Sequence, residues 1–121
     1  MYGLYQNQDV IRKYRKAVVF EGEKSVMKCD SYFGEYPAVA TYTCNITGYQ
    51  FRMLTELGVN KIILAYDLDQ IEDMKIVAKR LSKYYVSCYY LDGTGILDEK
   101  DSPIDKGPEN YKKLMKEKIR V

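Results

Sequence analysis

The chain has 121 residues, a length that suits one domain and is enough to bury a core without disulfide staples. Its composition is that of a soluble globular protein, with 46% hydrophobic residues, 30% charged residues and a net charge of +2. It contains no histidine, which excludes Ser-His-Asp and Cys-His mechanisms and zinc sites that mix cysteine with histidine. Any chemistry must therefore come from carboxylates, with lysines or a hard cation.

The three cysteines, Cys29, Cys44 and Cys88, are widely spaced and form no C-x-x-C pair. This spacing is typical of free thiols and not of a zinc ribbon or a disulfide framework. No apolar run reaches the length of a membrane helix, and the first residues lack the charged-then-apolar pattern of a signal peptide. We therefore expect a cytoplasmic protein with no membrane partner.

The first elements in chain order are a basic lead-in and two strands with a helix between them. The lead-in covers residues 1–16 and is expected to hold a short helix at residues 3–15. A second helix, at residues 25–32, is expected to bury Val26 and Met27. Short apolar runs predict strands that are buried on both faces, as in a parallel sheet. The four runs of this kind cover residues 17–20, 38–42, 61–66 and 86–91.

Three further amphipathic helices complete the chain. The third helix follows Thr47, which can cap it, and ends at Gly58; the fourth covers about 70–84; the last begins at Pro108. Alternation of strands and helices predicts an α/β fold with a central, mostly parallel four-stranded sheet flanked by helices, in one domain over residues 1–121. The predicted buried stripes of these helices are Phe51, Leu54 and Leu57; Ile71, Met74, Ala78, Leu81 and Tyr85; and Tyr111, Leu114, Met115 and Ile119.

Acidic residues follow three of the predicted strands. Glu21 comes directly after the first, Asp67 and Asp69 end the third, and Asp101 lies in the loop after the fourth. Because ligands of a parallel sheet bind beyond the carboxyl ends of its strands, these side chains are expected to converge there. Asp67 and Asp69 would share one face, so the pattern predicts an oxygen-only site for Mg²⁺ or Mn²⁺. The alternative is structural, with Asp69 capping the helix that follows it.

Basic residues gather in two places, one near each end of the chain. Beside an acidic centre, such patches suit a metal-dependent enzyme that acts on polyphosphates or nucleic acid, although they can also be solvated helix faces. Of the 13 tyrosines, those near the N-terminal basic run could stack on bases, whereas the four between residues 84 and 90 are expected to pack the sheet. The two basic groups are Arg12, Lys13, Arg15 and Lys16, and Lys112, Lys113, Lys116, Lys118 and Arg120.

Two segments carry a resemblance to a known family. Residues 20–25 read Phe-Glu-Gly-Glu-Lys-Ser after the first strand, and residues 66–69 read Tyr-Asp-Leu-Asp after the third. They resemble the TOPRIM domain, the metal-binding fold shared by bacterial and phage primases, topoisomerases and some nucleases. Residues 2–5, Tyr-Gly-Leu-Tyr, resemble the lead-in of bacterial-type primases; Gln50 matches a glutamine of their second helix; Lys100-Asp101 resembles their third acidic motif. The chain is expected to be a divergent primase TOPRIM domain excised from a longer protein.

The resemblance implies a parent protein that makes short RNA primers on single-stranded DNA from NTPs by Mg²⁺-dependent nucleotidyl transfer, with a replicative helicase as a further partner of its other parts. Asp67 and Asp69 would hold Mg²⁺ on the incoming triphosphate, helped by Asp101. Glu21 would ligate a second ion or act as base toward the primer hydroxyl. Phosphates would meet Lys24 and Lys100, and the template backbone would meet Arg12, Lys13, Arg15 and Lys16.

The sequence also departs from the family pattern. Ser25 stands where an aspartate is common, Gln70 and Ile71 replace the usual Ala-Gly after Asp-x-Asp, and the second aspartate of the third motif is displaced or missing within residues 100–105. These differences leave the second metal position open. Two other functions stay in view: a TOPRIM nuclease, and a non-catalytic α/β module that binds nucleic acid or a partner through its basic helices.

Overall fold

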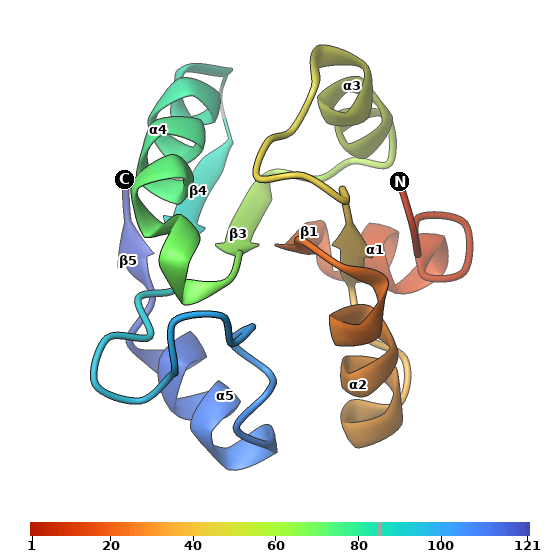
Figure 1. Cartoon of the computed structure of the whole chain (residues 1–121). Coiled ribbons are helices and arrows are strands. Elements are labelled where there is room, and N and C mark those ends of the chain that lie inside the picture. Colours follow the sequence, from red (N-terminus) through yellow and green to blue (C-terminus); the bar gives the residue numbers. More distant parts are fainter. Residues whose placement is uncertain (85) are drawn as a thin grey trace.

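The four apolar runs form parallel strands of one sheet in the computed structural model, which describes residues 1–84 and 86–121 (Figure 1). Neighbouring strands follow the order β2-β1-β3-β4-β5, and the first three pairings are parallel. The α/β class and the mostly parallel sheet are therefore confirmed. The four parallel strands are β1 (Lys16–Phe20), β2 (Ala38–Ala40), β3 (Lys61–Ala65) and β4 (Ser87–Tyr90).

Among the described residues the sheet has five strands, so the prediction of four was wrong. Strand β5 (Ile119–Arg120) pairs antiparallel with β4, and the Val121 N–H donates a further hydrogen bond to the Cys88 carbonyl. Ile119 was expected on the last helix, but that helix ends at Lys116. An open β4 edge would leave backbone donors and acceptors unpaired, and the tail satisfies them. The stabilisation of β5 comes from pairing with a strand that is distant in sequence, so the short basic segment gives no local signal for it.

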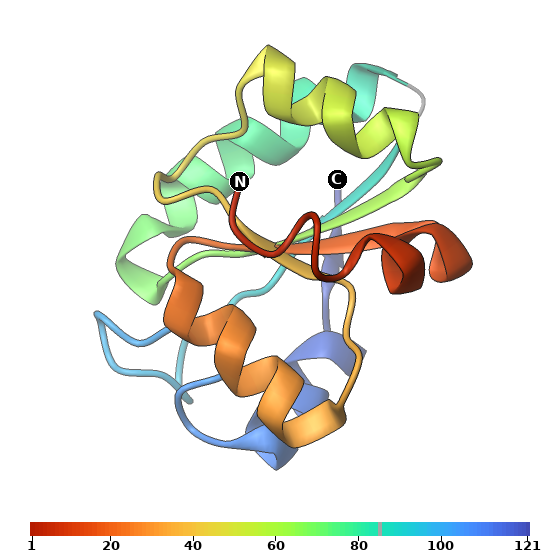
Figure 2. The same ribbon diagram turned by 90° about the vertical axis from the view of Figure 1, so that its right-hand side faces the viewer.

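Helices cover both faces of the sheet. Figure 2 shows α3 and α4 on one face and α2 and α5 on the other, while α1 and the start of α2 lie at opposite ends of β1. The predicted lead-in helix forms only in part, and short 3-10 turns, η1 (Leu68–Gln70) and η2 (Ser82–Tyr84), flank the fourth helix. Tyr85, predicted on its buried stripe, lies outside the described residues. The helices are α1 (Gln8–Tyr14), α2 (Glu23–Phe33), α3 (Gly48–Glu56), α4 (Ile71–Leu81) and α5 (Pro108–Lys116).

Two apolar clusters hold the layers together, one on each face of the sheet. The first joins strand residues such as Ile62 to Leu54 of α3 and Met74 of α4, and the second joins Ile63 to Val26 of α2. Alternate strand residues feed the two clusters, as the period of a strand requires. Met27, predicted to be buried, is 55% exposed because the turn of α2 carries it past the contact face.

Local signals fixed several helix ends. Thr47 and Gln50 form a reciprocal capping box, in which the Gln50 N–H donates to Thr47 Oγ1 at 3.2 Å and the Thr47 N–H donates to Gln50 Oε1 at 2.9 Å. The cap predicted at Thr47 is therefore confirmed, and Gln50 has a structural task in it. Pro108 opens α5 as expected. Among the described residues, no helix combines the length and apolarity that a membrane crossing needs.

The lead-in segment packs against β2. Tyr2 and Ala40 exchange two backbone hydrogen bonds of 2.9 Å, and Asn7 Nδ2 donates to the Ala38 carbonyl at 2.9 Å. Gly3 has a φ of 84°, and a Cβ there would lie 2.9 Å from the same Ala38 oxygen. Only glycine tolerates both conditions without strain. The Tyr-Gly-Leu lead-in therefore has a packing role in the fold.

Candidate active site at the carboxyl edge of the sheet

A cleft of about 390 Å³ opens where β1 and β3 end. One wall is the first part of α2, and the other is the loop between β4 and α5. Ligands of open α/β sheets bind in this position because strand ends and helix starts meet there. Two predicted acids, one predicted lysine and several residues not foreseen line it. The lining residues are Glu21, Gly22, Lys24, Ser25, Lys28, Tyr42, Asp67, Ser102 and Asp105.

Glu21 and Asp67 meet in the cleft from neighbouring strands. Phe20 and Ala65, the last residues of β1 and β3, are register partners, so the chain after each strand leaves the sheet at the same level. Burial, followed by the charges of Glu21 and Asp69, raises the pKa of Asp67 to about 6. Glu21 Oε1 is buried and has no hydrogen-bond partner among the described residues. Two acidic side chains thus lie close together in the cleft, where burial and their mutual repulsion disfavour the ionised form of Asp67.

Asp69 lies in η1, just behind the pair. It does not line the cleft, although its charge acts on the Asp67 carboxyl. Gln70, and not Asp69, is the N-cap of α4, and neither Gln70 nor Asp67 at the start of η1 makes a side-chain capping bond. The structural alternative for Asp69 as a helix cap was therefore wrong. The Asp69 N–H instead donates to the Glu99 carbonyl at 2.8 Å and anchors the neighbouring loop.

In the loop after β4, Asp105 lines the cleft and the predicted Asp101 does not. Asp101 Oδ2 accepts from the Asp98 N–H at 2.8 Å and lies 3.3 Å from Lys106 Nζ. The backbone bond to Asp98, with Lys106, lowers the pKa of Asp101. Its carboxylate is thus already satisfied within its own loop, and Asp101 serves as a turn residue there. The sequence signal for Asp105 was its position as a second aspartate four residues after Asp101 in the same motif.

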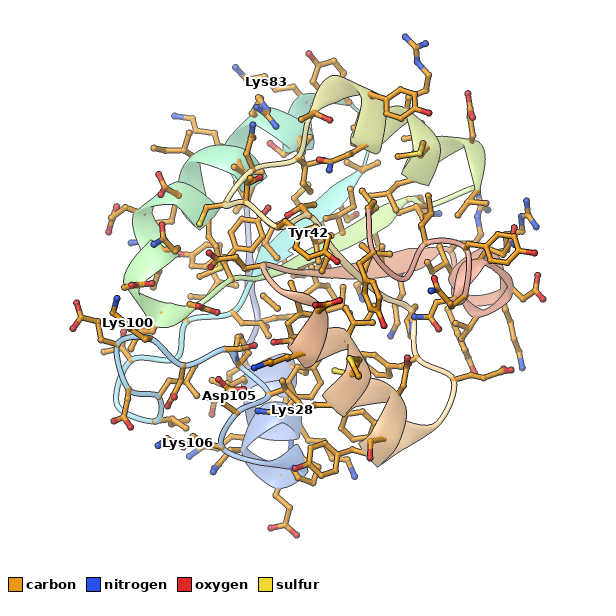
Figure 3. All side chains as sticks on the ribbon, turned by 45° about the vertical axis from the view of Figure 1, so that its right-hand side comes forward. Lys28, Tyr42, Lys83, Lys100, Asp105 and Lys106 are labelled. Atoms are coloured by element: carbon orange, nitrogen blue, oxygen red, sulfur yellow. The ribbon has the colours of Figure 1, made fainter. Side chains whose placement is uncertain are left out.

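The ammonium group of Lys28 links Asp105 to α2. Lys28 Nζ donates to Asp105 Oδ1 at 2.7 Å, while the Ser102 N–H donates to Asp105 Oδ2 at 2.9 Å. Figure 3 shows Lys28 and Asp105 side by side, with Lys100 at the outer margin of the loop. Lys100, predicted to bind phosphate, is exposed and does not line the cleft.

Ser25 also connects α2 to this loop. Its hydroxyl donates to Ser102 Oγ at 2.7 Å in a buried contact. Lys24 and Lys28 lie one turn apart on α2, so both can reach the cleft. Since Lys28 lies one helical turn after Lys24, the period of α2 could have predicted that it also reaches the cleft. The Ser25–Ser102 contact joins residues that are 77 apart in sequence, so it had no local signal.

Cys44 is a further neighbour that sequence reasoning missed. Burial, followed by the charges of Glu21 and Asp73, raises the pKa of its thiol to about 12. Cys44 is thus a neutral thiol beside the carboxylate pair. It follows β2, so its place after a strand end was the only available signal.

The predicted template-binding cluster lies at the other end of the sheet. Lys16 begins β1 and Glu21 follows its last residue, so five strand steps, about 17 Å, separate them. Arg12 lines a separate groove between α1 and α3 with Tyr5, and Arg15 Nε donates to the Gly58 carbonyl at 3.1 Å. These basic residues and the cleft acids therefore belong to opposite edges.

The donor set of the cleft fits a hard divalent cation. Carboxylate oxygens without hydrogen-bond partners are the ligands that Mg²⁺ and Mn²⁺ prefer. Within residues 1–84 and 86–121, no three carboxylate or thiol groups are arranged to hold one ion between them. Glu21 and Asp67 are the two cleft carboxylates that could hold such an ion, and an ion with two protein ligands keeps water or phosphate oxygens in its other positions, as Mg²⁺ commonly does.

Comparisons with known proteins agree with this fold. The chain is 34% identical, over its whole length, to the SPbeta prophage-derived uncharacterized protein YorJ of Bacillus subtilis strain 168 and covers 37% of it. It superposes on the crystal structure of the Aquifex aeolicus primase (zinc binding and RNA polymerase domains) with a TM-score of 0.78 and 22% identity, covering 98% of this chain and 30% of that one. No family model matches the chain. The chain has a primase-like fold and spans about a third of the length of either protein.

Proposed function

We propose that this chain is the metal-dependent, TOPRIM-type catalytic domain of a longer DNA primase-like protein, which joins ribonucleotides into a short RNA primer on single-stranded DNA. One observation carries the proposal: Glu21 and Asp67 are paired in a cleft at the carboxyl edge of a primase-like fold. A polar cleft of about 390 Å³ is large enough for a nucleotide's phosphates and ribose.

Each cleft residue has a task in this proposal. Glu21 and Asp67 would ligate Mg²⁺ or Mn²⁺, and Asp69 would add negative charge behind them. A bound divalent cation supplies charge neutralisation on the transferring phosphate. In the alternative role, Glu21 would act as base toward the attacking hydroxyl instead of ligating an ion, and its Oε1, which has no partner among the described residues, supports either role.

The start of α2 supplies the positive side of the site. Lys24 and Lys28 line the cleft. The N-cap residue of α2 is Gly22, which has no side chain to cap the helix, so the first N–H groups of α2 are available to phosphate oxygens. Lys28 would exchange Asp105 for phosphate when the nucleotide enters. Phosphoryl transfer needs mainly such positioning and charge stabilisation.

The metal claim is tested by titrating the chain with Mn²⁺ and following free Mn²⁺ by electron paramagnetic resonance. Asp67→Asn with Asp69→Asn should weaken binding at least tenfold, about 1.4 kcal/mol. Glu35→Gln with Glu56→Gln removes the same charge from exposed positions and should leave the affinity within twofold. Equal affinity in the Asp67/Asp69 variant would show that the ion binds elsewhere.

The reaction is tested with single-stranded DNA, NTPs and Mg²⁺, using the chain alone and within its longer parent protein. RNA products that disappear in Glu21→Gln support primer synthesis. Template shortening in place of RNA products would assign a nuclease reaction to the same residues. Binding of the template with neither product would support the non-catalytic module.

A further inference from the structure

A positively charged surface lies at the amino ends of the strands, opposite the acidic cleft. Lys16 begins β1 and Lys61 begins β3, and the two are register partners. Ile63, two residues after Lys61, is paired with Tyr89 of β4, which is paired in turn with Arg120 of β5. Since side chains two residues apart and register partners share a face, all of these side chains lie on the α2 and α5 side of the sheet.

The cations of this group lie against two tyrosine rings. The ring centre of Tyr89 lies 5.1 Å from Lys61 Nζ, 5.3 Å from Lys118 Nζ and 5.9 Å from the guanidinium carbon of Arg120. Distances of this size are those of cation–π contacts. A second ring, that of Tyr14, has Lys13 Nζ at 5.4 Å and Lys16 Nζ at 5.9 Å. The amino-edge surface is defined as Lys13, Tyr14, Lys16, Lys61, Tyr89, Lys118 and Arg120.

The cations of the amino-edge surface form no salt bridge with the other described residues. The salt bridges among the described residues involve Lys28, Lys75 and Lys106, and none includes a cation of this surface. Burial, followed by the positive charges of Lys61 and Lys118, lowers the pKa of Lys16. Five cations from four parts of the chain are thus held together against their mutual repulsion. An anion with several charges along its length would relieve this repulsion.

Tyr14 indicates which polyanion fits. Tyr14 is 56% exposed at the end of α1, and two cations lie beside its ring. An exposed ring beside phosphate-binding cations is the arrangement on which unpaired bases stack, whereas bases within a duplex are unavailable to it. An acidic peptide would use the cations but has no need of the ring.

We propose that the amino-edge surface binds single-stranded nucleic acid, with backbone phosphates at Lys61, Lys118 and Arg120 and a base stacked on Tyr14. This proposal deepens the proposed function. It rests on that function in one respect, because only a primase would use the bound strand as a template. About 17 Å of β1 separate this surface from the cleft, which is more than a Debye length at physiological salt. Binding here should therefore need no divalent cation.

The test is fluorescence anisotropy of a labelled oligo-dT strand with the whole chain, in EDTA, over a series of NaCl concentrations. The slope of log affinity against log salt should be negative, at about −0.7 per phosphate contact. Changing Lys61, Lys118 and Arg120 to Gln should make the slope shallower by about 2 and weaken binding on the order of tenfold at low salt. These changes keep most of each aliphatic stem on Tyr89, and circular dichroism checks the fold.

A matched control removes the same charge elsewhere. Arg52→Gln, Lys79→Gln and Lys113→Gln lie on exposed helix surfaces and should change affinity by less than twofold. Tyr14→Ala should weaken binding about tenfold, whereas Tyr14→Phe should retain it. The slope of the unchanged chain is a test that needs no variant: a slope near zero overturns the proposal.

Other outcomes also overturn it. Equal losses in the control variant would mean that net charge alone drives binding. Equal displacement by polyglutamate would indicate an acidic protein partner, and equal affinity for duplex DNA with no effect of Tyr14→Ala would exclude base stacking. Strand binding that persists in EDTA while no RNA is made would refute the proposed function and leave this inference standing.

Discussion

Asp67→Asn is expected to stabilise the metal-free protein at neutral pH. The carboxyl has an ordinary pKa of 3.8 and a pKa of about 6 in the fold, because of burial and then of Glu21 and Asp69. That difference corresponds to about 3 kcal/mol for a fully buried group, and solvent screening of this half-buried one leaves about 1 kcal/mol. An Asn side chain removes one negative charge and can donate to the Glu21 carboxylate. We therefore expect Tm to rise by about 3–5 °C at pH 7.5.

The sign and pH window of this effect follow from linkage. Since the folded-state pKa is raised, the loss of stability caused by Asp67 is absent below pH 3.8, grows as the pH rises from 3.8 to about 6, and is full above pH 6. The gain in Tm from Asp67→Asn should therefore be near zero at pH 4 and largest above pH 7, and Mg²⁺ should raise the Tm of the unchanged chain only. Thermal melts in EDTA and in Mg²⁺, with Glu35→Gln as a control, test this. A gain that does not vary with pH would refute the electrostatic reasoning.

Three further outcomes are expected from single positions. Thr47→Ala removes the capping bond to the Gln50 N–H and should lower the free energy of unfolding by about 1 kcal/mol in urea denaturation. Gly3→Ala forces a side chain into a φ of 84° and against the Ala38 carbonyl, so it should cost about 2 kcal/mol or more by the same assay. Cys44, with a pKa of about 12, should react slowly with a thiol reagent at pH 8 in the native protein and rapidly in urea.

Elements with local signals could be predicted from the sequence. The run from Lys61 to Ala65 is buried at four of its five positions because a parallel strand packs on both sides, and its composition alone carried that information. Pro108 and the Thr47–Gln50 pair marked helix starts because a missing N–H and a side-chain cap act within one turn. The pairing of Glu21 with Asp67 followed from parallel strands alone, since strand ends of one direction share one edge.

Features set by distant contacts could not be predicted. Strand β5 exists because β4 offers unpaired backbone groups about 30 residues earlier in the chain. Asp105 lines the cleft in place of the predicted Asp101 because of contacts made by the loop after β4. Lys106 and the Asp98 N–H satisfy the Asp101 carboxylate, whereas Lys28 from α2 holds Asp105 at the cleft. The amino-edge surface combines Lys16, Lys61 and Arg120 through sheet register, and register cannot be derived from composition.

The opposite charges of the two sheet edges would divide the work of a template-dependent enzyme. The cleft acids repel a nucleic-acid backbone, so an approaching strand is favoured at the amino edge, where Lys61 and Arg120 have no acidic partner among the described residues. A divalent cation at Glu21 and Asp67 would offset the charge of these acids and, together with Lys24 and Lys28, make the carboxyl edge attractive to phosphates. The protein should then bind template without metal and nucleotide with it, so EDTA should abolish nucleotide binding while oligo-dT binding persists.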